Sequence, residues 1–213
     1  MTENPVFDAR FQEELAELMR WRRDVRRFRA DPVPEALLAA LFDLAQISPS
    51  VGNSQPWRII RVQSADKRGE IRRNFLDCNA EALAAQSDDR AALYARLKLA
   101  GLDAAPVQLA VFCDHATEQG HGLGTRTMPE MLDYSVVCMI SGLWLAARAA
   151  GLGLGWVSIL DPARVAAALN APASYKLIAF LCIGWPEEEH VDPELVRSGW
   201  QARTDAGQKI VTV

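Results

Sequence analysis

The longest apolar stretch of the chain runs from Met131 to Ala150, MLDYSVVCMISGLWLAARAA. A membrane span needs about 20 mostly apolar residues, so the length alone would suit one. Asp133, Arg148 and several small polar residues interrupt the stretch, which indicates a buried helix of a soluble protein instead. A helix that is apolar on nearly every side must be covered on nearly every side. The rest of the fold, or a second subunit, therefore has to surround this helix.

Shorter apolar patterns on either side predict the remaining elements. We expect helices near residues 7–18, 34–48, 64–100 and 162–169, and strands near 57–63, 107–114, 154–159 and 177–184. Ser64 and Asp161 are the expected N-caps of the last two helices. Strands that alternate with helices are typical of a parallel α/β sheet. Two consecutive helices at the start of the chain and an apolar central helix do not fit that pattern.

The size and charge of the chain restrict its organisation. It has 213 residues and a formal net charge of −4. This length favours one domain, and no repeat or linker divides it. We therefore expect a single domain over residues 1–213, with a polar tail from about residue 186 that ends in KIVTV. General nucleic-acid binding is disfavoured, because domains with that function are usually basic.

The N-terminus and the cysteines both indicate a cytoplasmic protein. The first ten residues, MTENPVFDAR, lack the basic segment and apolar run of a secretory signal. Cys78, Cys113, Cys138 and Cys182 are far apart, and three of them lie in apolar runs. Free thiols in a reducing compartment are therefore expected.

Positive charge is concentrated in RWRRDVRRFR, residues 20–29, although the chain as a whole is acidic. Arg22 and Arg26 share a face if the first helix continues, and they point the same way if the backbone is extended. Either conformation lets two guanidinium groups converge on one anion, and the planar guanidinium suits phosphate oxygens. A solvated basic helix end is the alternative.

Hydroxyl and amide side chains are concentrated in SPSVGNSQPW, the loop at 48–57 between a helix and a strand. Side-chain amides both donate and accept, which suits the edge of a heterocycle that carries carbonyl and N–H groups. An ordinary turn is the alternative, although Asn53, Ser54 and Gln55 in succession are unusual for one. A second loop at 114–129 is Gly-rich and long enough to be functional or mobile.

Other motifs do not point to a function. GLGLGW at 151–156 lacks the preceding strand and following helix of a dinucleotide-binding fingerprint, so we expect a helix C-cap that leads into a tightly packed strand. His115, His121 and His190 show no metal-ligand spacing, and no metal site is predicted. No P-loop or GxSxG pattern supports a nucleoside triphosphatase or a hydrolase.

Taken together, the arginine motif and the polar loop resemble those of the nitroreductase-like flavoproteins. That family has an Arg-Arg-Ser-x-Arg motif, which binds the FMN phosphate and ribityl chain, and a Pro-Ser-x-x-Asn-x-Gln-Pro-Trp loop that touches the flavin. Here they read RRDVR at 22–26 and PSVGNSQPW at 49–57. The similarity continues through Ala105-Pro106, the long helix and GLGLGW, and it covers most of the chain.

The resemblance implies a fold that differs from the one suggested by the strand pattern. It implies an α+β fold with a mixed central sheet wrapped by helices, in a homodimer with two FMN sites at the interface. A partner subunit would also explain the apolar central helix. The tail at 186–213 is expected to pack on the partner.

One departure from the family motif is informative, because Asp24 stands where the family has serine. With TMPE at 127–130 and LWLAARAAGLGLGWVSI at 143–159, it resembles one branch of the family. Enzymes of that branch break up reduced FMN with O2, releasing 5,6-dimethylbenzimidazole, the cobalamin lower ligand, and erythrose 4-phosphate. The branch implies FMNH2 as substrate, O2 as co-substrate and a separate NAD(P)H-dependent flavin reductase as supplier.

The resemblance also assigns roles to individual residues. It implies that Asp24 and Ser158 are the catalytic residues beside the reacting flavin. Arg22, Arg23 and Arg26 are expected to hold the phosphate and the ribityl chain. The other expected flavin contacts are Val25, Ser50, Asn53, Gln55, Lys98, Ile159 and Arg203, with Lys98 at the pyrimidine carbonyls and Arg203 as a second phosphate ligand.

A carboxylate suits the reaction, because fragmentation requires proton removal from the ribityl carbon attached to the ring. The nearby arginines are expected to lower the pKa of Asp24 and keep it ionised. The Ser158 hydroxyl would hydrogen-bond the flavin. The structural alternatives are a salt bridge of Asp24 with Arg22 or Arg27, and a backbone-bonded strand hydroxyl at Ser158.

Two other functions stay open on these residues. One is an NAD(P)H-dependent nitroreductase or quinone reductase, in which FMN is retained as a cofactor. The other is a flavin carrier without enzymatic activity. Asp24 is the sequence feature that favours fragmentation over the reductase.

Overall fold

The sheet has four strands, and each pairs with its neighbour in the antiparallel sense. The structure is a computed structural model that describes residues 4–86, 91, 93–94, 101–204 and 209–213. The strands follow the order β1 (Trp57–Arg61), β2 (Val107–Asp114), β4 (Tyr175–Gly184) and β3 (Gly153–Val157). An isolated parallel bridge between Asp24 and Leu154 adds the arginine motif to the β3 edge.

These ladders confirm the α+β class and show that the parallel sheet suggested by the strand–helix alternation is wrong. The reason is visible between β1 and β2, where Arg61 pairs with Leu109 and Trp57 pairs with Cys113. The segment between β1 and β2 returns the chain to the end of the sheet at which β1 stops. Strand β2 therefore runs antiparallel to β1. The alternation of strand and helix patterns in a sequence predicts which elements form. It does not predict whether neighbouring strands run parallel or antiparallel.

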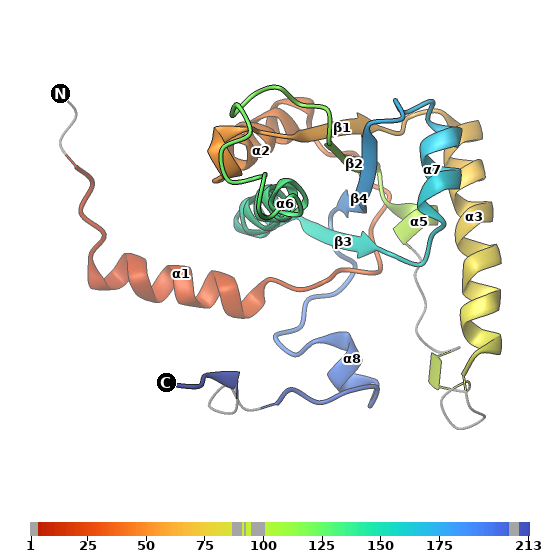
Figure 1. Cartoon of the computed structure of the whole chain (residues 1–213). Coiled ribbons are helices and arrows are strands. Elements are labelled where there is room, and N and C mark those ends of the chain that lie inside the picture. Colours follow the sequence, from red (N-terminus) through yellow and green to blue (C-terminus); the bar gives the residue numbers. More distant parts are fainter. Residues whose placement is uncertain (1–3, 87–90, 92, 95–100, 205–208) are drawn as a thin grey trace.

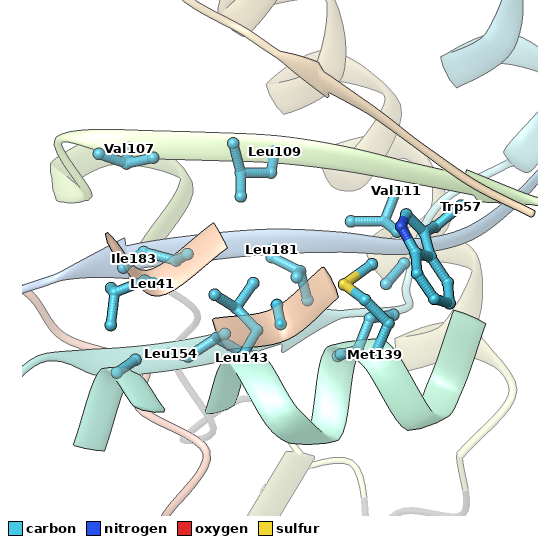
Figure 2. Packing of buried hydrophobic residues seen from close by; sticks show 14 of the residues in the cluster. Leu41, Trp57, Val107, Leu109, Val111, Met139, Leu143, Leu154, Leu181 and Ile183 are labelled. Atoms are coloured by element: carbon cyan, nitrogen blue, oxygen red, sulfur yellow. The ribbon is translucent and has the colours of Figure 1, made fainter. Parts of the chain in front are cut away.

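Helices cover both faces of the sheet, which explains why β2 is a continuous apolar run. Val107, Leu109 and Val111 face the layer of α2 (Glu35–Gln46) and α6 (Met131–Ala149), and Figure 2 shows them across from Met139 and Leu143. The intervening Ala110 and Phe112 pack toward the layer of α3 (Ala65–Ala84) and α7 (Pro162–Ala168). Alternate residues of a strand point to opposite faces, so both faces require apolar side chains.

The predicted caps begin the helices as expected. The Ser64 side chain accepts the Lys67 N–H at the start of α3, and Asp161 accepts the N–H groups of Ala163 and Arg164 at the start of α7. The other helices of the described residues are α1 (Ala9–Trp21), η1 (Val51–Asn53), α5 (Gly101–Ala104) and α8 (Glu194–Arg197).

The long apolar helix is only partly covered by its own chain. One face of α6 is buried, through Ser135, Val136, Met139, Ile140, Leu143 and Ala147. Another face leaves Tyr134 51% and Val137 41% exposed, with Cys138 beside them. Among the described residues, α6 is long and apolar enough to cross a membrane by length and composition, and 33% of that window is buried. An apolar strip of α6 is thus left open.

The two ends of the chain also expose apolar side chains. Helix α1 buries no residue: Phe11, Leu15 and Met19 are exposed on it, and Phe7 is exposed just before it. In the tail, Ile210 and Val211 are exposed as well. Figure 1 shows α1 and the C-terminal segment below the sheet layers, at the side where α6 and β3 lie. The packing of this tail on a partner stays a prediction.

The four cysteines are free thiols, as the sequence analysis predicts. Cys113 and Cys182 are buried and Cys78 is half-buried, whereas Cys138 is exposed on α6. Position in an apolar run therefore did not guarantee burial.

Candidate active site

The RRDVR motif leaves α1 as an extended segment and lies against the start of β3. The Val25 N–H donates to the Leu154 carbonyl over 3.1 Å. An added Cβ at Gly155 would lie 2.1 Å from the Val25 carbonyl oxygen, and one at Gly153 would lie 2.7 Å from the Val25 side chain. Only glycine allows this approach of two backbones. The glycines of GLGLGW therefore serve backbone packing, as expected.

The extended conformation sends the three motif arginines to different partners. The Arg22 guanidinium lies 4.8 Å from the centre of the Trp144 ring. The Arg23 Nε donates to the Val191 carbonyl over 2.6 Å. Arg26 faces the carboxylate of Asp24, with its Nε 3.5 Å from Oδ2. The helical interpretation of the arginine spacing is thus wrong, because α1 ends at Trp21.

The carboxylate of Asp24 is anchored by the backbone of β3. The Trp156 N–H donates to Asp24 Oδ1 over 2.9 Å. Burial has the largest influence on this carboxyl group and raises its pKa, while the Trp156 N–H and Arg26 lower it by less. The expected net lowering of the Asp24 pKa is therefore wrong, because Arg26 lowers the pKa as predicted but burial raises it by more. Arg22 and Arg23 have other partners, and desolvation of the carboxylate outweighs the charge of Arg26.

The alternative salt bridges of Asp24 do not form between the described residues. Arg27 pairs with Glu188 instead, and Arg22 lies against Trp144. The ion pair of Asp24 with Arg26 is the one that the geometry supports. About a third of the Asp24 side chain stays exposed, 36%, so the carboxylate remains accessible from the adjoining cleft.

Two other basic side chains, Arg22 and Arg203, lie near Arg23. Its pKa is lowered, first by burial and then by the positive charges of Arg203 and Arg22. Arg203 thus lies near the motif although it is 180 positions further along the chain. Like charges repel, and a bound anion would relieve that repulsion. This basic cluster of Arg22, Arg23 and Arg203 fits the phosphate role that the sequence analysis predicts for these residues.

The polar loop at 48–57 is held in a strained conformation near the start of α6. Gly52, Asn53 and Gln55 have φ values of 56°, 55° and 43°, in the left-handed region. The Val51 N–H donates to the Ser135 Oγ over 3.0 Å, and the Gln55 N–H donates to the Ser50 Oγ over 3.1 Å. Left-handed backbone at non-glycine residues is costly and is often found at ligand sites.

The side chains of this loop also contact one another. Gln55 Nε2 donates to Asn53 Oδ1 over 3.1 Å, and the Asn53 carbonyl accepts a hydrogen bond from Gln119. The Ser54 hydroxyl is buried and makes no hydrogen bond within the part of the chain that is described. The loop at 114–129 packs directly on this turn, because an added Cβ at Gly120 would lie 2.9 Å from the Gly52 carbonyl oxygen.

The two motifs contact α6 at separate places along its length. The polar loop bonds to Ser135, whereas the arginine motif meets Trp144, whose indole N–H donates to the Arg23 carbonyl. Nine residues of helix separate these positions by about 13 Å. The cleft beside Asp24 has a volume of ≈ 40 Å³. Pockets for small organic ligands are usually about 300–1,000 Å³, so this cleft alone does not hold a flavin.

The remaining predicted residues fall into three cases. Ser158 is exposed just beyond the end of β3, two residues after the Trp156 N–H that holds Asp24. Two residues of strand span about 7 Å, so Asp24 and Ser158 lie near each other. Ile159 packs partly against the core beneath α7. Lys98 lies outside the described residues.

Sequence reasoning missed Trp144 and Glu194. Trp144 holds both Arg22 and the backbone of Arg23, and the Glu194 carboxylate lies 3.9 Å from Arg26. Neither residue is near the motif in the sequence or belongs to a local pattern. A contact across 121 or more positions has no local signal that could have revealed it.

The similarity to known proteins covers the residues described above. The family model described as "Nitroreductase family" matches residues 19–185, which include both motifs. A 5,6-dimethylbenzimidazole synthase of Rhodospirillum rubrum is 59% identical over 203 residues, 95% of this chain and 96% of that protein. A 5,6-dimethylbenzimidazole synthase of Rhodobacter capsulatus is 49% identical over 92% of this chain and 94% of its own length.

The chain belongs to the nitroreductase family. It is accordingly an oxidoreductase, and its similarity to family members named 5,6-dimethylbenzimidazole synthase agrees with the prediction from its motifs. The nitroreductase-like fold is also shared with oxidized iodotyrosine deiodinase, whose crystal structure has FMN and 3-iodo-L-tyrosine bound. That structure has a TM-score of 0.70 and 25% identity over 83% of this chain and 91% of its own.

Proposed function

We propose that the chain fragments reduced FMN with O2, releasing 5,6-dimethylbenzimidazole and erythrose 4-phosphate. The observation that carries this proposal is Asp24, a half-buried carboxylate in the motif where the family resemblance predicts a serine. Its backbone anchor on β3 brings it near Ser158. The relatives named 5,6-dimethylbenzimidazole synthase support the identity of the product.

The residues around the motif fit a flavin mononucleotide. The basic cluster would hold a phosphate group, because several guanidinium groups whose charges repel one another favour a dianion. Arg26 is the neighbour of Asp24, which suits a position along the ribityl chain. Ser50, Asn53 and Gln55 would provide the polar groups that face the ring edge, with Val25 and Ile159 as apolar contacts and Lys98 at the pyrimidine.

The proton step falls to Asp24. The raised pKa of its carboxyl group makes it a stronger base than an ordinary aspartate, which suits proton removal from the ribityl carbon next to the ring. The Trp156 N–H holds Oδ1, and Oδ2, which faces Arg26 at 3.5 Å, is the oxygen that would take the proton. The Ser158 hydroxyl would donate a hydrogen bond to the flavin. Bound reduced flavin supplies the electrons that O2 accepts.

A second subunit completes this proposed site. The 13 Å between the two motif contacts and the small cleft argue that one flavin takes the arginine motif from one chain and the polar loop from another. The open strip of α6 and the exposed apolar residues of α1 are suited to such a homodimer interface. A separate NAD(P)H-dependent reductase in the cytoplasm would supply FMNH2.

One assay separates fragmentation from the alternatives. Chemically reduced FMN is supplied with air, and the products are separated and identified. We expect 5,6-dimethylbenzimidazole and erythrose 4-phosphate in equal amounts. Intact FMN with NAD(P)H-dependent turnover of nitroaromatics would indicate a reductase, and stable bound FMN without turnover would indicate a carrier.

The variant Asp24→Ser tests the residue that carries the proposal. We expect it to lose fragmentation while FMN binding stays largely intact, because the phosphate and ring contacts come from other residues. Loss of flavin binding in this variant would make Asp24 a structural residue and contradict its proposed role.

A further inference from the structure

A cysteine, a histidine and an aspartate meet at the end of β2, apart from the arginine motif. The Cys113 Sγ, an imidazole nitrogen of His115 and a carboxylate oxygen of Asp133 all lie within 4.8 Å of one another. No metal-ligand spacing was evident in the sequence, because Asp133 comes from α6, 18 positions after His115. The fold supplies the third side chain.

Two rigid elements position these side chains. Cys113 and His115 are two residues apart at the end of β2, so they point to the same face. That face is covered by α6, where Asp133 lies in the first turn. The His115 N–H donates to the Ser174 carbonyl, which extends the β2–β4 pairing to His115. Asp114, between the two, bonds to Arg58 and Ser174.

The three atoms are those that Zn²⁺ prefers, a thiolate sulfur, an imidazole nitrogen and a carboxylate oxygen. At Zn–ligand bond lengths of about 2.0–2.3 Å, tetrahedral ligand atoms lie roughly 3.4 Å apart. The present separations are at most 4.8 Å, and His115 Nε2 lies 2.8 Å from Asp133 Oδ1. Shifts of about 1 Å or less in each side chain would give the tetrahedral spacing.

We propose that Cys113, His115 and Asp133 form a binding site for a borderline-soft divalent cation of the Zn²⁺ type, with the fourth position open to water. Binding replaces the thiol proton of Cys113 by the metal, so one proton is released to solvent for each ion bound. The ion would join the end of β2 to the start of α6, where Ser135 holds the polar loop.

Two groups of the metal-free protein compete with metal binding: the Lys176 ammonium, which pairs with Asp133, and the proton on the Cys113 thiol. Lys176 Nζ lies 2.5 Å from Asp133 Oδ2, and its side chain is 60% exposed, so it can turn to solvent. Burial and the neighbouring Asp133 raise the pKa of Cys113 to about 12, so the thiol is protonated and unreactive without a metal. Lys176 would compete with the metal for the Asp133 carboxylate. Removal of the Lys176 side chain should therefore strengthen metal binding.

The test is a Co²⁺ titration of the purified full chain, since Co²⁺ reports thiolate ligation by a charge-transfer absorption band. We expect one Co²⁺ per chain, with the band removed by added Zn²⁺. His115→Ala should weaken binding by roughly 100-fold, the order expected for loss of a ligand. Lys176→Ala should tighten it. His121→Ala, an exposed histidine of the next loop, is the matched control and should bind as the unmodified chain does.

Three outcomes would overturn the proposal. They are absence of the thiolate band, unchanged affinity in His115→Ala, and weaker binding in Lys176→Ala, which would make Lys176 a structural partner of Asp133. Cys113→Ala should abolish the band. Because Cys113 is buried, circular dichroism of that variant is compared with that of His115→Ala, whose exposed side chain can be removed without opening the core.

Discussion

At the residue scale, the proposed reaction depends on Asp24, a carboxylate that the fold makes less acidic. The sequence was sufficient to predict its place in the motif, because RRDVR differs from the family pattern at this position. It was insufficient to predict the direction of its pKa. That direction depends on desolvation and, to a smaller extent, on the charge of Glu194, which meets Asp24 only in the folded chain.

Asp24→Asn should stabilise the fold while it removes activity. The folded pKa of Asp24 is raised above its ordinary value of 3.8, so the favourable protonated state is lost as pH rises through that window. At neutral pH the buried charge therefore costs stability, and asparagine can still accept the Trp156 N–H. We expect a higher Tm at pH 7, a smaller difference near pH 4, and fragmentation reduced by at least about 100-fold.

Thermal unfolding at the two pH values and the product assay check this prediction. A lower Tm of Asp24→Asn at pH 7 would show that the ion pair with Arg26 outweighs desolvation, contrary to the direction inferred for the pKa.

The basic cluster should distinguish FMN from riboflavin. Arg203→Ala and Arg22→Ala each remove a cation from the proposed phosphate site, and a charge-assisted hydrogen bond contributes about 1.5–3 kcal/mol. We expect roughly tenfold or greater loss of FMN affinity with little change for riboflavin, measured by fluorescence titration. Arg29→Ala, whose exposed side chain pairs with Asp31, is the control. An unchanged preference would move the phosphate site elsewhere.

The element scale shows which predictions follow from local pattern and which do not. The bounds of β2 agree with its apolar run, and α6 begins with the apolar stretch at Met131 and ends one residue before it, at Ala149. Strand β3 begins at Gly153 and ends at Val157, earlier than expected, because its pairing with β4 stops at Phe180. Strand direction and the exposure of one face of α6 depend on distant segments, so the sequence pattern did not indicate them.

Gly155→Ala tests the packing of the arginine motif on β3. The added methyl would lie 2.1 Å from the Val25 carbonyl oxygen, so the two backbones must separate. We expect a loss of about 1–3 kcal/mol in the free energy of unfolding, measured by chemical denaturation, together with weaker flavin binding. Gly69→Ala on α3 is the control, because its Cβ has ordinary contacts and alanine favours a helix by up to about 1 kcal/mol. Equal stability of the two variants would contradict the close approach.

At the scale of the whole molecule, the proposed flavin site and the apolar surface both point to a second subunit. The arginine motif and the polar loop meet α6 at different positions, and the strip around Val137 has no cover within the described part of the chain. The family resemblance predicted a dimer, and this arrangement gives a physical reason for one. The sequence could not show which wall of the proposed flavin site each subunit contributes. The distance between the arginine motif and the polar loop is set by the folded helix α6, and a linear sequence does not contain it.

Val137→Glu should disrupt the proposed dimer. A charge in the open strip of α6 would be buried without a partner in the interface, which is costly. We expect the unmodified protein to sediment at twice 23.5 kDa and the variant to sediment nearer 23.5 kDa, with loss of flavin binding. Leu76→Glu, an equally exposed position on α3, should remain dimeric and bind flavin. A monomeric unmodified protein that binds flavin would refute the shared site.

The anchor of Asp24 is a main-chain N–H, which affects how position 156 can vary. Any residue there except proline presents the same donor to the carboxylate, so drift at this position leaves the orientation of Asp24 unchanged. The aromatic ring of Trp156 packs against Trp144, and this contact is independent of the hydrogen bond to Asp24. Relatives that keep this geometry can therefore differ at position 156. Changes of side chains in β3 would alter the cleft beside Asp24 while the Asp24 carboxylate stays in place.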